Sequence, residues 1–201
     1  MGRKLFMCDG GVIAMPDPTL VFVDRHDGGH LVVIPPREVW ERSELTAAEL
    51  THWSSLVAAT GKAMLDVLPQ LEGGCINYWE AGNWALNQQA EPYGFKTAKE
   101  HRKVHLHLLG RSPTATNRSL RWGEAPTFPD FVDRYSWAER NQPLTGEESH
   151  RLVGAVEATL REKYFFDSSR IGSRYDCDQC GYPAIDRGKM ENICGECLPS
   201  L

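Results

Sequence analysis

Two histidines stand one residue apart inside an alternating apolar run, residues 103–111 (KVHLHLLGR). Apolar side chains at every second position are typical of a half-buried β-strand, whose side chains alternate between its two faces. The intervening valine and leucine residues are therefore predicted to face a core, and His105 and His107 to project together from the opposite face. A chain with this segment is constrained to form a sheet that carries two imidazole rings on one side.

The same alternation continues backwards from these histidines to Lys103 and His101. If the strand extends that far, four consecutive odd positions line one side of a cleft with nitrogen-bearing side chains. Such a row suits the binding of phosphate groups. The alternative is that His101 and Lys103 are solvated residues at the end of the strand.

The composition limits the size of the fold and its partners. With 201 residues, 41% of them hydrophobic and 24% charged, the chain is long enough for one sizeable core and a small appendage. The formal net charge of −5 gives no reason to expect general binding of nucleic acid. No signal peptide is visible, and no run approaches the roughly 18 apolar residues that a membrane-spanning helix needs. We therefore expect a cytoplasmic protein without membrane contact.

Turn residues and hydrophobic patterns outline a main domain over residues 1–166. The sequence predicts strands at residues 19–24 and 31–34, joined as a hairpin through an Asp-Gly-Gly turn, and two short strands at 75–79 and 83–87. Capping-box sequences beginning at Thr46 and Thr145 each open an amphipathic helix, of which the first should cover a face of the sheet.

One long segment of this domain shows no clean period. Residues 112–143 are rich in Pro, Arg, Trp and Asp, which predicts an irregular excursion. We expect its aromatic residues to pack it in place: Trp122, Phe128, Phe131 and Trp137.

Three segments carry a wider pattern: residues 29–35 (GHLVVIP), 45–50 (LTAAEL) and 105–111 (HLHLLGR). In order and spacing they resemble successive landmarks of the histidine triad family. The resemblance covers residues 15–111 well, the rest of the main domain weakly and the C-terminal tail not at all. It implies an α+β domain with a five-stranded antiparallel sheet, commonly a homodimer, that binds nucleotides and cleaves or transfers at the α-phosphorus.

The resemblance also implies roles for three histidines. His105 matches the nucleophile of the family, which forms a nucleotidyl-histidine intermediate; a neutral imidazole has the free lone pair that this requires. His107 matches the residue that orients the nucleophile through its main-chain carbonyl and contacts phosphate with its ring. His30 matches the upstream histidine that supports this cluster.

Two further binding residues follow from the same resemblance. Asp24 resembles the acid that holds the ribose hydroxyls. Asn87 resembles the asparagine on the phosphate side, although Asn77 or Asn83 could take that place.

The sequence departs from the family at the first histidine of the triad, where it has Lys103. Lysine is a poor acid-base group unless it is desolvated, and His101 could compensate. The approach to the histidines, residues 88–100, is longer than usual, so the leaving group is not indicated by the resemblance, and Thr97 is a weak substitute for the hydroxyl found there. Basic residues gather before the nucleophile: Lys96, Lys99, Arg102 and Lys103.

That basic cluster would favour a leaving group that carries several phosphates, as in a dinucleoside polyphosphate. The alternative is a solvated run of charges, above all for Lys96 and Lys99.

The C-terminal tail, residues 174–201, carries two C-x-x-C pairs separated by thirteen residues. This spacing predicts a four-thiolate zinc ribbon; a redox dithiol or a rubredoxin-like iron centre is the alternative. Residues 165–201 contain four Lys or Arg and six Asp or Glu, so we expect a structural or dimer-stabilising module, and a nucleic-acid partner is unlikely on this charge. The predicted metal ligands are Cys177, Cys180, Cys194 and Cys197.

Two functions are consistent with these patterns. The first is an enzyme, a nucleotide hydrolase or nucleotidyl transferase that uses His105. The second is a module that binds nucleotides or nucleic-acid ends and has lost turnover through Lys103 and the altered loop. The intact His105 and His107 pair, together with His30, favours the enzyme.

Overall fold

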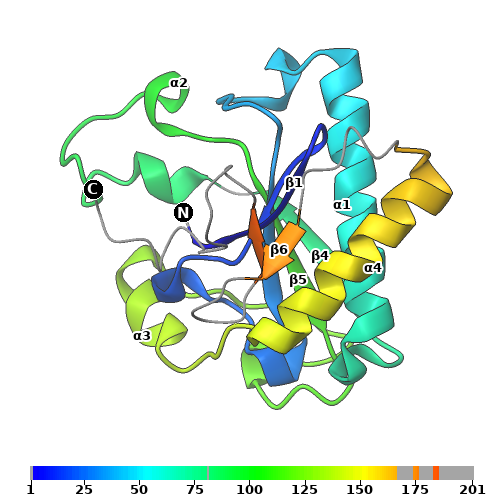
Figure 1. The fold of residues 1–201 in the computed structure, drawn as a ribbon. Helices are drawn as coiled ribbons and strands as arrows, with labels where there is room; N and C mark the ends of the chain where they lie inside the picture. The colour runs from blue at the N-terminus through cyan, green and yellow to red at the C-terminus, as the bar shows by residue number, and fades with distance from the viewer. Residues whose placement is uncertain (1, 81, 167–173, 177–182, 186–201) are drawn as a thin grey trace.

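The computed structural model describes residues 2–80, 82–166, 174–176 and 183–185, and within them the chain forms an α+β fold (Figure 1). Its main sheet has five strands, in which every pair of neighbours is antiparallel. This confirms the predicted five-stranded antiparallel sheet. In spatial order the strands are β1 (Lys4–Cys8), β2 (Gly11–Ala14), β3 (His30–Ile34), β5 (Leu106–Arg111) and β4 (Cys75–Glu80).

Two long helices, α1 (Ala47–Val67) and α4 (Gly146–Tyr164), pack against each other beside the sheet (Figure 1). Both begin with the predicted capping box: the Thr46 and Thr145 hydroxyls accept from the N–H three residues on, at 3.3 and 3.2 Å. Apolar side chains of both helices and of the strands form one continuous core, which includes Trp53, Leu56, Val153, Leu31 and Leu108.

A second, smaller cluster of apolar residues joins Leu109 of β5 to Phe22, Val23 and Leu120. Two of the aromatic residues expected to pack the excursion at residues 112–143, Phe128 and Trp137, are packed on this cluster. All six residues of β5 are buried, so this strand is covered on both faces rather than half-buried as expected. Trp122, expected to pack, is 43% exposed.

The excursion contains only short elements, η6 (Arg118–Leu120), η7 (Phe131–Asp133) and α3 (Arg134–Ala138). Arg111, at the end of β5, holds its early part: one of its terminal nitrogens donates to the carbonyls of Leu120, Arg121 and Glu124 at 2.8–3.2 Å. Two other 3-10 turns flank α1, η3 (Arg42–Glu44) and η4 (Pro69–Leu71).

Two predicted strands are wrong. Residues 19–24 begin inside the turn η1 (Pro18–Leu20) and continue without a strand to Asp24. Asp24 caps a further turn, η2 (Arg25–Asp27), because its carboxylate accepts from the His26 N–H at 2.8 Å. Residues 83–87 form the 3-10 helix η5 (Asn83–Leu86) after Gly82, whose φ is 138°. β3 pairs with β5 on one side and with β2 on the other, and β2 belongs to a β1–β2 hairpin turned at Asp9-Gly10 that the prediction missed.

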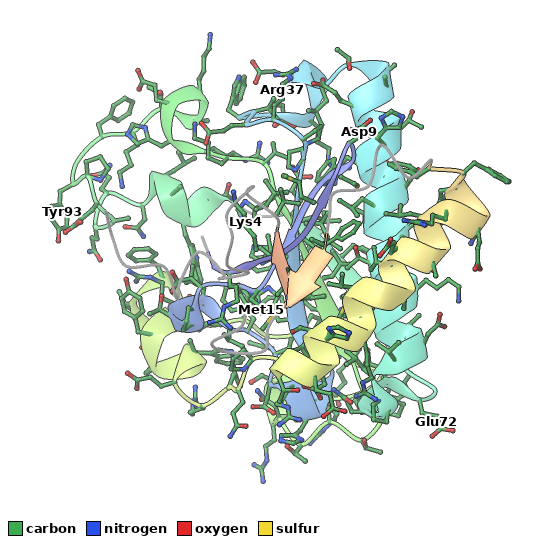
Figure 2. The ribbon with its side chains drawn as sticks, viewed as in Figure 1. Lys4, Asp9, Met15, Arg37, Glu72 and Tyr93 are labelled. Atoms are coloured by element: carbon green, nitrogen blue, oxygen red, sulfur yellow. The ribbon has the colours of Figure 1, made fainter. Side chains whose placement is uncertain are left out.

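The histidine strand is shorter than predicted. β5 begins at Leu106, and His101 belongs to the short helix α2 (Ala98–His101) instead. The long loop before α2 carries Tyr93, which is 75% exposed at the edge of the molecule in Figure 2.

Two short strands of the tail, β6 (Arg174–Asp176) and β7 (Pro183–Ile185), pair antiparallel as a separate ribbon. The predicted zinc ligands Cys177, Cys180, Cys194 and Cys197 lie outside the described residues. Within the described ranges, no group of three or more His, Cys, Asp or Glu side chains is arranged to hold a metal ion. The helices there include none with the length and apolar character needed to cross a lipid bilayer.

Candidate active site

The pairing of β3 with β5 brings three histidines together. His30 is the first residue of β3 and lies opposite Leu109, two residues beyond His107 on β5. Diagonal neighbours on adjacent strands share a face of the sheet, so the two rings meet there, with His30 Nε2 2.9 Å from His107 Nδ1. The ring of His105, just before β5, packs edge-to-face on His107 with ring centroids 4.7 Å apart.

The hydrogen bonds of His30 fix where its proton and that of His107 lie. The backbone N–H of Phe22 donates to His30 Nδ1 at 3.2 Å, so this nitrogen is an acceptor. A neutral imidazole has one donor and one acceptor, and His30 therefore donates from Nε2 to His107 Nδ1. His107 is left with its proton on Nε2, which makes that atom a hydrogen-bond donor.

His105 has the opposite pattern. Its Nδ1 lies 2.7 Å from the carbonyl oxygen of Lys103, and a carbonyl can only accept, so Nδ1 carries the proton. Nε2 of His105 therefore has a free lone pair. The resemblance implied that the carbonyl of His107 would orient this ring; the structure shows that the Lys103 carbonyl does so.

Burial keeps all three rings neutral. His30 is 1% exposed, and burial, followed by the nearby His105, lowers the pKa of His30 to about 3. Burial and the neighbouring histidines hold the pKa of His107 well below its usual value. Burial also lowers the pKa of His105, although the Lys103 carbonyl and Glu80 act in the opposite direction. At neutral pH the site thus presents a bare nitrogen on His105 beside an N–H on His107.

Two cavities share His105 and His107 and form what we call the cleft. One, of about 230 Å³, has mostly aliphatic walls and is the aliphatic half of the cleft. The other, of about 380 Å³, is lined by aromatic rings and is the aromatic half. The aliphatic walls include Ala14, Met15, Pro16, Val32 and Ile34. The aromatic walls are Phe22, Trp79 and Trp84.

Lys103 and His101 also line the aliphatic half of the cleft. The four odd positions therefore share a cavity, although only His107 lies in the strand itself. His101 approaches from α2 with its Nδ1 3.2 Å from the carbonyl oxygen of Thr97. Lys103 Nζ forms an ion pair with the exposed carboxylate of Glu38, which competes with a phosphate for this charge.

Asp24 and Asn87 line neither half of the cleft. The two oxygens of Asp24 accept from the backbone N–H groups of His26 and Gln142 at 2.8 and 2.6 Å, and Asp24 lines a different, polar cavity. Asn87 uses its side-chain oxygen to accept from the Gln89 N–H at 2.8 Å. Of the asparagines considered, Asn83 lines the aromatic half.

The basic cluster before the nucleophile is mostly engaged elsewhere. Lys96 is 8% exposed, and its Nζ donates to the carbonyls of Asn87 and Ala90 at 2.7 and 2.6 Å. Arg102 is paired with Glu41 and Glu80. Lys99 is exposed. Among the residues described here, Lys103 is the only one of these four that lines the cleft.

The aromatic half of the cleft was not predicted from the sequence. Trp79 lies on β4 opposite His107, and its ring stacks on Phe128 of the excursion with centroids 4.5 Å apart. Phe22 packs edge-to-face on Trp84 with centroids 5.5 Å apart. These aromatics come from three separated segments, so only the density of aromatic residues near the histidines could have pointed to them.

Comparison with known proteins adds no family to this picture. The chain matches no family model in a scan of known protein families, and no curated protein is significantly similar to it in sequence. The site is therefore defined by its own geometry, which is that of three neutral imidazoles at the junction of two cavities.

Proposed function

We propose that this chain is a nucleotide hydrolase or nucleotidyl transferase of the histidine triad type, which acts at the α-phosphorus through a nucleotidyl-histidine intermediate on His105. The observation that carries the proposal is the free lone pair on His105 Nε2 in a cleft that also holds the His107 N–H. An unprotonated imidazole is a competent nucleophile at neutral pH.

In the first step, the lone pair of His105 Nε2 forms a bond to phosphorus, and the bond from phosphorus to the leaving group breaks with its electron pair. The positive charge that develops on the ring is stabilised at Nδ1–H by the carbonyl of Lys103. In the second step, water or another acceptor attacks phosphorus and releases its proton to solvent. The phosphorus–nitrogen bond then breaks, and its electron pair returns to Nε2.

Charge also develops on the phosphoryl oxygens, and His107 Nε2–H is the donor placed to stabilise it. The bond from His30 fixes this proton, so the donor needs no reorganisation during the reaction. Removal of one such donor typically costs about a hundredfold or more in rate.

The lining of the cleft supports an uncharged or singly charged leaving group better than a dinucleoside polyphosphate. Lys103, the one cation of the basic cluster on the described lining, is paired with Glu38. The aromatic half offers the rings of Trp79 and Trp84, and such rings suit the stacking of a nucleobase.

Turnover of nucleoside monophosphate esters and amides tests this proposal. We expect wild-type protein to release the nucleoside monophosphate, and His105→Asn to lose at least about a thousandfold in kcat, because the variant has no nucleophile. His26→Asn is the matched control, since His26 is exposed and lines a different cavity. Full activity of His105→Asn would refute the mechanism.

A second candidate is a nucleotide-binding module without turnover. It is favoured by the ion pair between Lys103 and Glu38, which leaves the cleft with little free positive charge for a transition state. Under this alternative, a nucleoside monophosphate binds with equal affinity to the wild type and to His105→Asn, and neither turns over any substrate.

Zinc binding by the four tail cysteines and homodimer formation remain proposals from the sequence. Metal content after dialysis of the full chain tests the first, with about one zinc per chain expected. Sedimentation of the same sample tests the second.

A further inference from the structure

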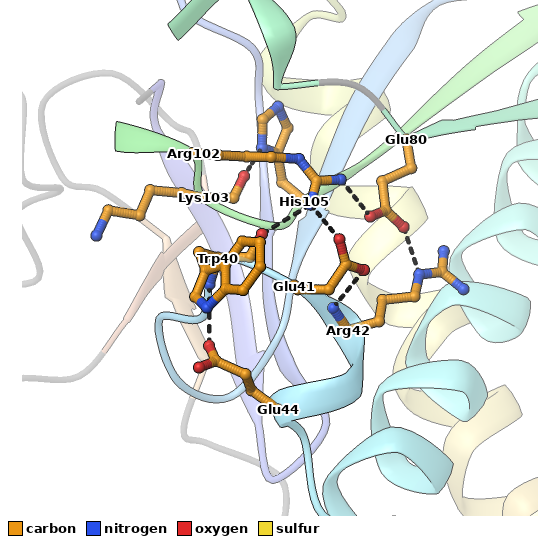
Figure 3. A network of polar contacts seen from close by, with 8 residues as sticks. All are labelled: Trp40, Glu41, Arg42, Glu44, Glu80, Arg102, Lys103 and His105. Carbon is orange, nitrogen blue, oxygen red and sulfur yellow. Dashed lines mark hydrogen bonds and ion pairs between the residues drawn. The ribbon is translucent and has the colours of Figure 1, made fainter. Parts of the chain in front are cut away.

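We propose that Arg102 is a positioning residue for His105: its guanidinium group fixes the segment whose Lys103 carbonyl holds the imidazole ring, and so aims Nε2 into the cleft. The inference rests on the proposed function, because it concerns the delivery of the same nucleophile. Figure 3 shows Arg102 beside His105, with its guanidinium group directed at the two carboxylates that it binds.

The Arg102 guanidinium joins three segments of the chain. Nη1 donates to the carbonyl of Trp40 and to Oε2 of Glu41, both at 2.7 Å. Nη2 donates to Oε1 of Glu80, at the end of β4, at 3.1 Å. The side chain is only 16% exposed, so these charge-assisted bonds are partly shielded from water. Arg102 therefore ties the loop before η3 and the end of β4 to the segment that leads into β5.

Lys103 lies between this anchor and a second one. The backbone N–H of Val104 donates to the carbonyl of Val39 at 2.9 Å, in the same loop that Arg102 holds through Trp40. The Lys103 side chain adds an ion pair with Glu38 of that loop. With both neighbours attached, the Lys103 carbonyl cannot turn away from His105 Nδ1 unless one of these contacts breaks.

The stem of Arg102 also packs behind the wall of the cleft. Gly82, which lines both halves, has a φ of 138°, and a Cβ built there would lie 3.1 Å from Arg102 Cγ and 3.3 Å from Nε. The absence of a side chain at this position leaves the space that Arg102 occupies.

Arg42 cannot replace Arg102 in this role. It also forms an ion pair with Glu80, but it is 45% exposed and makes no hydrogen bond to the Trp40 carbonyl among the described contacts. Loss of Arg102 would therefore leave Glu80 paired and the loop unattached to the His105 segment at this point.

The test compares Arg102→Gln with Arg37→Gln in the full chain. Arg37 pairs with Glu49 at 2.8 Å in the same loop region but does not contact the segment before β5, so it is the matched control. We expect Arg102→Gln to lower kcat on a nucleoside monophosphate ester about ten- to a hundredfold, with KM nearly unchanged, because a displaced nucleophile slows chemistry more than binding. Arg37→Gln should keep wild-type kcat.

Nitrogen-15 NMR of the histidine rings gives a readout that a purely structural role would not move. We expect the Nδ1–H tautomer of His105 in the wild type and in Arg37→Gln, and a mixture of tautomers in folded Arg102→Gln. If Arg102→Gln does not fold, Glu41→Gln removes the negative charge from one of the three acceptors and should shift the tautomer in the same direction by less.

The pH profile provides a second such readout. Among the described residues, the charged groups that act on the pKa of His105 are Arg102, which lowers it, and Glu80, which raises it. His107 packs on the His105 ring. Three other titratable residues line the aliphatic half of the cleft: Asp17, His101 and Lys103. Loss of the Arg102 charge should move the acid limb of kcat/KM to higher pH, and Arg102→Lys should restore it.

An unchanged tautomer with unchanged kcat in folded Arg102→Gln would overturn this inference alone, since inactivity of His105→Asn would still support the proposed function. If the wild type turns over no substrate, the proposed function fails, and the tautomer in Arg102→Gln still decides the role of Arg102.

Discussion

At the scale of single residues, the protons of the site are placed by buried hydrogen bonds. One backbone N–H, that of Phe22, sets the acceptor nitrogen of His30, and this in turn sets the donor nitrogen of His107. An exposed histidine would instead exchange freely between tautomers and charge states. The opposite tautomer of His105 follows from a single carbonyl, that of Lys103.

These neutral rings predict a loss of stability in mild acid. The folded-state pKa of His30, about 3, lies below the unfolded value of about 6.5, so the unfolded chain binds protons first as the pH falls. Stability should be fully present above about pH 6.5 and decrease below it, by up to about 1.4 kcal/mol per pH unit for each such histidine. Urea unfolding at pH 7 and pH 5 measures this change.

Carboxylates protonate mainly below pH 5 and contribute little between pH 7 and pH 5. His26→Asn, which alters an exposed histidine, should keep the wild-type pH dependence, and His30→Gln should weaken it. Equal stability of the wild type at pH 7 and pH 5 would contradict neutral burial of these rings.

His101 is the residue that we expect to protonate the leaving group, because it lines the cleft while Lys103 is held by Glu38. His101→Asn should then lower kcat/KM about a hundredfold for a substrate with an alkyl alcohol leaving group. It should have little effect with p-nitrophenol, which leaves without a proton. An equal loss on both substrates would show that His101 does not act as an acid.

The sequence predicted the residues that share a strand register better than those brought together by loops. Spacing along one strand grouped His105 with His107, the family resemblance added His30, and the structure brings the three rings together. Asp24 and Asn87 were not brought to the cleft, since each uses its side chain to cap a local turn. The aromatic walls depend on contacts between distant segments, which no local pattern contains.

At the scale of elements, prediction succeeded where caps and periodicity agreed. α1 and α4 begin at their capping boxes, and β3, β4 and β5 lie within or close to their predicted ranges. The two wrong strands have apolar sequences that local turns override. The missed β1–β2 hairpin had a visible signal, an Asp-Gly-Gly turn at residues 9–11 between two short apolar runs.

The loop before α2 is held by one buried amine, which gives a prediction at this scale. Lys96 Nζ donates to two loop carbonyls, so Lys96→Met removes both bonds at nearly constant side-chain volume. We expect a loss of about 2 kcal/mol and faster proteolysis within residues 87–96. The exposed Lys99→Met is the control and should change neither, as measured by urea unfolding and limited digestion. Wild-type resistance of Lys96→Met would show that the two bonds do not hold the loop.

At the scale of the whole molecule, the sheet has a core on each side, and the histidines lie where the smaller core meets the cleft. The helices α1 and α4 cover one face, and the excursion covers Leu109 and Phe22 on the other. Phe22 and Trp79 pack on the His107 ring, and Phe128 of the excursion packs on both of them, while the junction of the two cavities leaves His105 accessible.

The most direct test of this account is to trap the intermediate. Wild-type protein mixed with a nucleoside monophosphate ester, quenched in alkali and digested, should yield a peptide spanning His105 that carries the mass of one nucleotidyl group. The adduct should be lost on mild acid treatment, as for a phosphorus–nitrogen bond, and be absent from His105→Asn. Turnover with no adduct on His105, or an adduct on any other residue, would contradict nucleophilic catalysis by His105.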